Sequence, residues 1–169
     1  ELDVEQYTTE TEDYWERGKS ALRYDFAGLL RRLGSRRTWV ILWVISLFTA
    51  ILSWPGLPAE IPIQWNHGEA VSMAPRACIF IYPAVMIVWR MILIPYLYMT
   101  LWNTRFGSLI AEYAVNGLCF AGLTAEIFTV FYVHGVIRTG IFPLLAVDGA
   151  LLLMLLVLGL WELNRQLED

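Results

Sequence analysis

Charged residues are scarce in this sequence. Asp, Glu, Lys and Arg make up 17% of the 169 residues, whereas 57% of the residues are hydrophobic. A soluble domain usually carries about 25% charge, and a disordered chain is poor in apolar residues. Both classes are therefore disfavoured. The net charge of -4 also argues against a protein that binds nucleic acid.

Cysteine and histidine are equally sparse, and this limits the chemistry. The two cysteines and two histidines show neither a CxxC nor an HxxxH spacing, so we predict no metal site, no disulfide framework and no cofactor. The sequence also lacks a nucleophile elbow, a phosphate-binding glycine loop and an HExxH motif. We therefore expect a protein that is not an enzyme. An intramembrane enzyme using Glu126, Asp148 or His67 is the least favoured alternative.

Four long segments contain almost no charge. Residues 38–59 have none, and residues 77–102, 113–133 and 139–161 have one each. About 20 apolar residues are enough to cross the hydrocarbon core of a bilayer as a helix. The sequence predicts an all-α membrane protein, a bundle of four transmembrane helices at about 38–54, 78–102, 110–132 and 141–161. Proline at positions 83 and 95 should bend the second helix unless neighbouring groups satisfy the freed carbonyls.

The distribution of arginine predicts the orientation of the four spans, since basic residues are retained on the cytoplasmic side. Seven arginines flank the spans on one side and two flank them on the other. The larger group is Arg23, Arg31, Arg32, Arg36, Arg37, Arg105 and Arg165, and the smaller group is Arg76 and Arg138. We expect both termini, including a tail at 162–169, to be cytoplasmic.

Residues 1–37 hold 15 of the 28 charged side chains and form a separate element. Thr9 and Glu12 have the spacing of a helix capping box. Apolar residues then recur at helical spacing: Trp15, Leu22, Phe26, Leu29, Leu30 and Leu33. We predict an amphipathic helix that lies in the interface against the bilayer. Packing under the bundle, or against a partner protein, remains the alternative.

The loop at 55–76 connects the first two predicted spans on the outer side. Three prolines in its first eight residues disfavour a helix. Apolar residues Ile61, Ile63 and Trp65 then alternate with other residues, and His67 with Gly68 provides a turn. We predict a structured extracytoplasmic loop, extended and folded back on itself, that covers the outer end of the bundle.

The same loop carries a motif, written Leu-Pro-x-x-Ile-Pro-x-Gln-Trp-Asn. Its members are Leu57, Pro58, Ile61, Pro62, Gln64, Trp65 and Asn66, with Gly68 two positions later. The motif resembles the LPxxIPxHWN signature of a bacterial membrane domain of unknown function found at the N-terminus of SdpI-type immunity proteins. Gln64 stands where that signature has histidine, so no metal or proton role of the histidine is carried over.

The resemblance implies a place in the bacterial cytoplasmic membrane and a role in binding. The loop would recognise a peptide, a toxin or a partner membrane protein, as an immunity or accessory factor does. In this hypothesis Gln64, Trp65 and Asn66 present polar and aromatic contacts. The bilayer itself is the other expected partner.

Three ionisable residues lie inside the predicted spans, namely Arg90, Glu126 and Asp148. Unpaired charges at such depth are costly, and their predicted depths differ by about 10 Å or less, so we expect the three to face one another. One interpretation is a structural lock between helices. The other is a site for an ion or proton, in which case the protein is a small transporter or channel.

Overall fold

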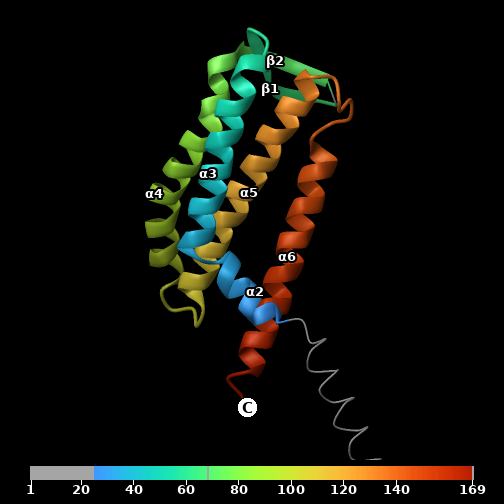
Figure 1. Cartoon of the computed structure of the whole chain (residues 1–169). Helices are drawn as coiled ribbons and strands as arrows, with labels where there is room; N and C mark the ends of the chain where they lie inside the picture. Colours follow the sequence, from blue (N-terminus) through green and yellow to red (C-terminus); the bar gives the residue numbers. More distant parts are fainter. Residues whose placement is uncertain (1–24, 68, 169) are drawn as a thin grey trace, which may run out of the picture.

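The computed structural model describes residues 25–67 and 69–168, and it is mostly helical (Figure 1). A short helix precedes four long ones, and a pair of strands lies between the first two long helices. The helices are α2 (Phe26–Leu33), α3 (Arg36–Ser53), α4 (Ile81–Leu101), α5 (Gly107–Val133) and α6 (Phe142–Arg165).

The four long helices are long and apolar enough to cross a membrane, which confirms the predicted number of spans. Their outward faces carry large apolar side chains: Leu52, Met99 and Leu153 are each more than 60% exposed. Apolar faces of this extent are typical of helices that contact lipid. The chain is a multi-pass membrane protein.

Helix α5 is the centre of the bundle. Ten of its residues are buried, whereas α3, α4 and α6 contribute two buried residues each. Met86 of α4 packs with Val115, Cys119 and Leu123 of α5 in one of the core clusters. Helix α6 lies to one side of the bundle, next to α5 and α2 (Figure 1).

The segment between α3 and α4 forms an antiparallel hairpin. Strand β1 (Glu60–Asn66) pairs with β2 (Glu69–Pro75), and 3-10 turns at Trp54–Gly56 and Arg76–Phe80 join the pair to the helices. His67 at the reversal has a left-handed backbone with φ of 50°. The fold is therefore helical with a two-stranded sheet added, and not purely α. We call this end of the bundle the hairpin end and the opposite end the α2 end (Figure 1).

The two prolines of α4 have different positions. Pro83 lies in the first turn, where its missing N–H would have no partner within the helix in any case. Pro95 lies in the interior, and α4 nevertheless continues from Ile81 to Leu101 as one helix.

Helix α2 packs against α6. Asp25 caps its first turn by accepting a hydrogen bond from the Gly28 amide at 2.7 Å. Leu30 is buried beside Gly159 of α6, and the Ala27 amide donates to the Glu162 carboxylate at 3.1 Å. The described end of the predicted N-terminal element thus contacts the bundle through α6.

Of two predictions for the ends of the chain, one falls outside the described residues and the other differs from the structure. The predicted capping box of Thr9 and Glu12, with Trp15 and Leu22, lies outside the described residues. Helix α6 continues to Arg165, so part of the predicted tail is helical.

Candidate functional site

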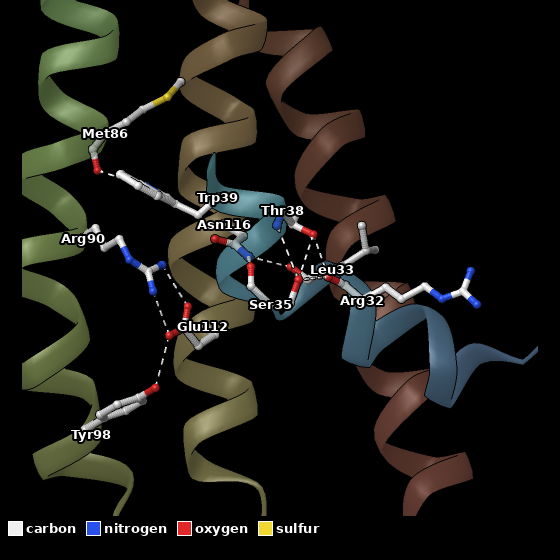
Figure 2. Close-up of polar contacts among 10 residues, drawn as sticks. All are labelled: Arg32, Leu33, Ser35, Thr38, Trp39, Met86, Arg90, Tyr98, Glu112 and Asn116. Carbon is white, nitrogen blue, oxygen red and sulfur yellow. Dashed lines mark hydrogen bonds and ion pairs between the residues drawn. The ribbon is translucent and has the colours of Figure 1, made fainter. Parts of the chain in front are cut away.

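The strongest polar contact between long helices joins α4 to α5. Arg90 donates to both carboxylate oxygens of Glu112, with Nη1–Oε2 and Nη2–Oε1 distances of 2.9 and 3.0 Å (Figure 2). The Tyr98 hydroxyl adds a third donor to Oε1 at 3.2 Å. The two charged side chains are only 16% and 15% exposed. This bidentate geometry satisfies the carboxylate and fixes the two helices in register.

Helix α3 is attached to the same pair through Trp39. The guanidinium carbon of Arg90 lies 5.0 Å from the centre of the Trp39 ring, which is within the range of a cation–π contact. The indole N–H of Trp39 donates to the carbonyl of Met86 on α4 at 3.3 Å (Figure 2). Arg90 therefore links α3, α4 and α5.

The predicted cluster of Arg90, Glu126 and Asp148 is not formed. Glu126 lies 14 residues beyond Glu112 on α5, which corresponds to about 21 Å along the helix axis. Asp148 makes no hydrogen bond or ion pair with any residue that the structure describes. Glu112 is the actual partner of Arg90. Arg105 donates to Asn164 at 3.3 Å.

Glu126 has a separate polar environment toward the hairpin end. It is fully buried, and the Ser46 hydroxyl of α3 donates to its Oε2. Its Oε1 has no partner among the described residues. One turn further along α5, the Thr129 hydroxyl shares a 3.1 Å hydrogen bond with that of Tyr82 on α4. These contacts join the same three helices a second time.

Asn116 is a buried polar residue that our sequence analysis missed. Its amide donates to the carbonyls of Leu33 and Ser35 at 2.6 and 2.9 Å (Figure 2). In the same turn, the hydroxyls of Ser35 and Thr38 both donate to the Arg32 carbonyl at 2.6 Å. The carbonyls between α2 and α3 thus find donors without water. The signal in the sequence was an amide inside the apolar run of the third span.

The apolar members of the loop motif anchor the hairpin to the bundle. Leu57 and Ile61 are buried with Ala50 of α3 and Ile79 of the second 3-10 turn, and Pro62 is buried as well. Because these residues are enclosed, they cannot themselves contact a ligand. Their role in the structure is to hold the strands.

Trp65 anchors the other end of β1 on α5. Its ring centre lies 5.3 Å from that of Phe128 and 4.9 Å from that of Tyr132. Trp65 is thus partly covered. We had expected it to present its ring to a binding partner. Gln64 is exposed and accepts a hydrogen bond from Ser72 at 3.0 Å.

The remaining motif positions are less informative. Pro58 and Asn66 are exposed, and Gly68 lies outside the described residues.

Three apolar side chains of the hairpin stay exposed, and we call them the hairpin patch. Ile63 of β1 is 56% exposed, and Val71 and Met73 of β2 are 57% and 50% exposed. Val71 and Met73 share one face of β2, because residues two apart in a strand point to the same side. These side chains give the hairpin an exposed apolar surface to which another apolar molecule could bind.

The two histidines lie in separate turns of the chain. His67 is in the hairpin turn, and a ring nitrogen of His134 lies 2.7 Å from the carbonyl of Val130. The part of the chain that the structure describes contains no group of three or more potential metal ligands.

One part of the chain is similar to a known protein family. Residues 24–87 match a domain of unknown function, DUF1648. They are similar to that domain. The match runs from α2 through α3 and the hairpin into α4, and it ends before Arg90. No curated protein and no solved structure matches the chain.

Proposed function

We propose that this chain is a non-enzymatic protein of the bacterial cytoplasmic membrane that binds a membrane-active peptide or toxin, or a segment of a partner membrane protein. The binding surface is the hairpin patch of Ile63, Val71 and Met73. One observation carries the proposal: an apolar patch is exposed on a hairpin that packs against the bundle through Ile61 and Trp65. The role is that of an immunity or accessory factor.

The arrangement suits the capture of an extended apolar peptide. A two-stranded sheet has two unpaired edges, and an exposed edge can accept a further strand through main-chain hydrogen bonds. Strand β2 has backbone donors from Glu69 to Ala74, whereas β1 is interrupted by Pro62. Because the hairpin is already ordered, binding would cost little conformational entropy.

The distribution of arginine supports an orientation with the hairpin outside the cell. Among the described residues, six arginines lie at the α2 end, and two lie at the hairpin end. The α2 end has Arg31, Arg32, Arg36, Arg37, Arg105 and Arg165, and the hairpin end has Arg76 and Arg138. Basic residues are retained in the cytoplasm, so both termini are cytoplasmic in this proposal.

The orientation can be tested with single cysteines. In a chain with Cys78 and Cys119 replaced by alanine, Val71→Cys probes the hairpin end and Thr104→Cys probes the turn between α4 and α5. A membrane-impermeant maleimide should label Val71→Cys in intact cells and Thr104→Cys only after the cells are permeabilised. The reverse pattern would place the hairpin in the cytoplasm and contradict the proposal.

The binding function can be tested in cells that lack the gene. These cells should lose survival in conditioned medium of their own strain or in purified membrane-active peptides, and the wild-type gene should restore it. The double variant Val71→Ser, Met73→Ser should fail to restore survival at equal protein level. Leu167→Ser, an equally exposed position at the α2 end, serves as the matched control and should restore it. Equal survival with and without the gene, against every peptide tested, would refute the proposal.

Transport through a buried charge cluster is the weaker proposal. It requires the three ionisable groups in one pathway, whereas Arg90 is bound to Glu112 by both of its terminal nitrogens. It predicts that neutral substitution of Arg90, Glu126 or Asp148 abolishes ion flux in proteoliposomes while the protein stays folded. Loss of folding on substituting Arg90 would instead support a structural lock.

A further inference from the structure

A cavity lies between α3, α5 and α6 and is separate from the hairpin patch. Its volume is about 260 Å³, and its walls are almost entirely apolar, with Leu42, Phe120 and Leu155 among the lining residues. Phe120 and Leu151 line the cavity and are 40% and 50% exposed on the outer surface of the spans. The cavity therefore opens sideways, toward the hydrocarbon of the bilayer. We call it the lateral cavity.

Among the residues that the structure describes, Asp148 is the only charged one that lines the lateral cavity. Its Oδ2 atom is buried and has no hydrogen-bond partner among the described residues. Asp148 as a whole is half-buried, and a carboxylate inside a membrane-spanning segment is costly without a partner. A group that donates a hydrogen bond to Asp148, or that carries positive charge beside it, would lower the free-energy cost of placing this carboxylate in the spans.

The protein's own donors around the cavity are already used. The Asn116 amide donates to the turn between α2 and α3, and the Tyr113 hydroxyl donates to the Leu152 carbonyl at 2.6 Å. The Thr38 hydroxyl donates to the Arg32 carbonyl. Among the described residues, no lining side chain donates to Asp148, so its buried oxygen is free to accept from an occupant of the cavity.

We propose that the lateral cavity binds an organic ammonium ion that partitions into the membrane. Its ammonium group pairs with the carboxylate of Asp148, and its aliphatic or aromatic body lies against Leu42, Phe120 and Leu151. The apolar walls with a single charged group are the pattern of a small-molecule site, and the volume lies just below the lower limit of such sites, about 300 Å³. Access is from the lipid, through the side that Phe120 and Leu151 border.

The test compares two photoactivatable probes on the full chain in lipid nanodiscs. One probe is a straight-chain alkylamine with a diazirine in its chain, and the other is the alcohol of identical chain. Labelled peptides are identified by mass spectrometry. In the wild-type protein we expect the amine to label the segments around Phe120 and Leu151.

Substitution of Asp148 provides the decisive comparison, because both proteins meet the same probe concentration in the same lipid. Close charge pairs contribute at least about 1.5 kcal/mol in measured cases, which corresponds to about tenfold in affinity. Asp148→Asn should therefore lower labelling by the amine about tenfold and leave labelling by the alcohol unchanged. Asp148→Glu, which keeps the charge, should retain labelling by the amine.

Two tryptophan variants test whether the cavity is the site. Leu151→Trp fills the lateral cavity and should reduce labelling by both probes. Leu153→Trp lies on α6 away from the cavity, is similarly exposed, and should change neither. The proposal is overturned if Asp148→Asn lowers labelling by the two probes equally, or if it leaves labelling by the amine unchanged.

Discussion

The bidentate pair of Arg90 and Glu112 should respond to mutation as a unit. Removing one partner leaves the other charged and largely enclosed, and breaking a buried pair in this way typically costs 3–5 kcal/mol. The side chains are 16% and 15% exposed, so we expect the lower end, about 3 kcal/mol of unfolding free energy, for Arg90→Leu. Replacing both with leucine removes both charges and should restore stability to within about 1 kcal/mol of wild type.

The two single substitutions should not be equivalent. After Glu112→Leu, Arg90 still has the Trp39 ring 5.0 Å away, and a cation–π contact contributes about 0.5–2 kcal/mol. After Arg90→Leu, Glu112 keeps only the Tyr98 hydroxyl at 3.2 Å. We therefore expect Glu112→Leu to be the less destabilising of the two by about 0.5–1 kcal/mol.

The measurement is reversible unfolding in mixed micelles, followed by far-ultraviolet circular dichroism. The double-mutant cycle should give a coupling energy of at least about 2 kcal/mol. Arg105→Ala, which breaks the exposed contact with Asn164, is the control and should change stability by less than about 0.5 kcal/mol. A coupling energy below about 0.5 kcal/mol would refute the reasoning that this pair holds α4 and α5 together.

Three further substitutions test other contacts by the same unfolding measurement. Gly159→Ala places a Cβ 2.7 Å from that of Leu30 and should weaken the contact between α2 and α6. Gly149→Ala, with no atom within 4 Å of the added Cβ, should be neutral or stabilising. Equal effects of the two substitutions on stability would contradict the packing of α2 on α6. Asn116→Leu should cost about 2–3 kcal/mol, because two partly buried carbonyls lose their donor, and a cost below about 0.5 kcal/mol would contradict that role. Trp65→Ala should cost about 3 kcal/mol and make the hairpin more sensitive to protease, and unchanged proteolysis would mean that Trp65 does not anchor it.

The membrane spans could be predicted because hydropathy is a local property of the sequence. Helix α6 has a mean hydropathy of 2.4 over its most apolar window, and no knowledge of its neighbours is needed to place it in a bilayer. The docking of α2 could not be predicted in the same way. It depends on Gly159 and Glu162, which lie more than 120 residues away in the chain, and neither position has a local pattern that identifies its partner.

The partner of Arg90 shows why charged pairs are harder to predict than spans. Our expectation compared depths measured from the centre of each span, which favoured Glu126 and Asp148. The short connection at 102–106 is a better reference, because it fixes the ends of α4 and α5 side by side. Arg90 lies 11 residues from the end of α4, whereas Glu112 lies 5 residues and Glu126 lies 19 residues from the start of α5.

These offsets can be converted into distances along the axis. Relative to Arg90, Glu112 is displaced by six residues, about 9 Å toward the turn, and Glu126 by eight residues, about 12 Å toward the hairpin. These two displacements differ by only about 3 Å. The arginine side chain extends toward Glu112, where the Trp39 ring and the Tyr98 hydroxyl also contact the ion pair. The choice of partner was therefore decided by residues from three helices together, and it leaves Asp148 without an ion-pair partner among the described residues.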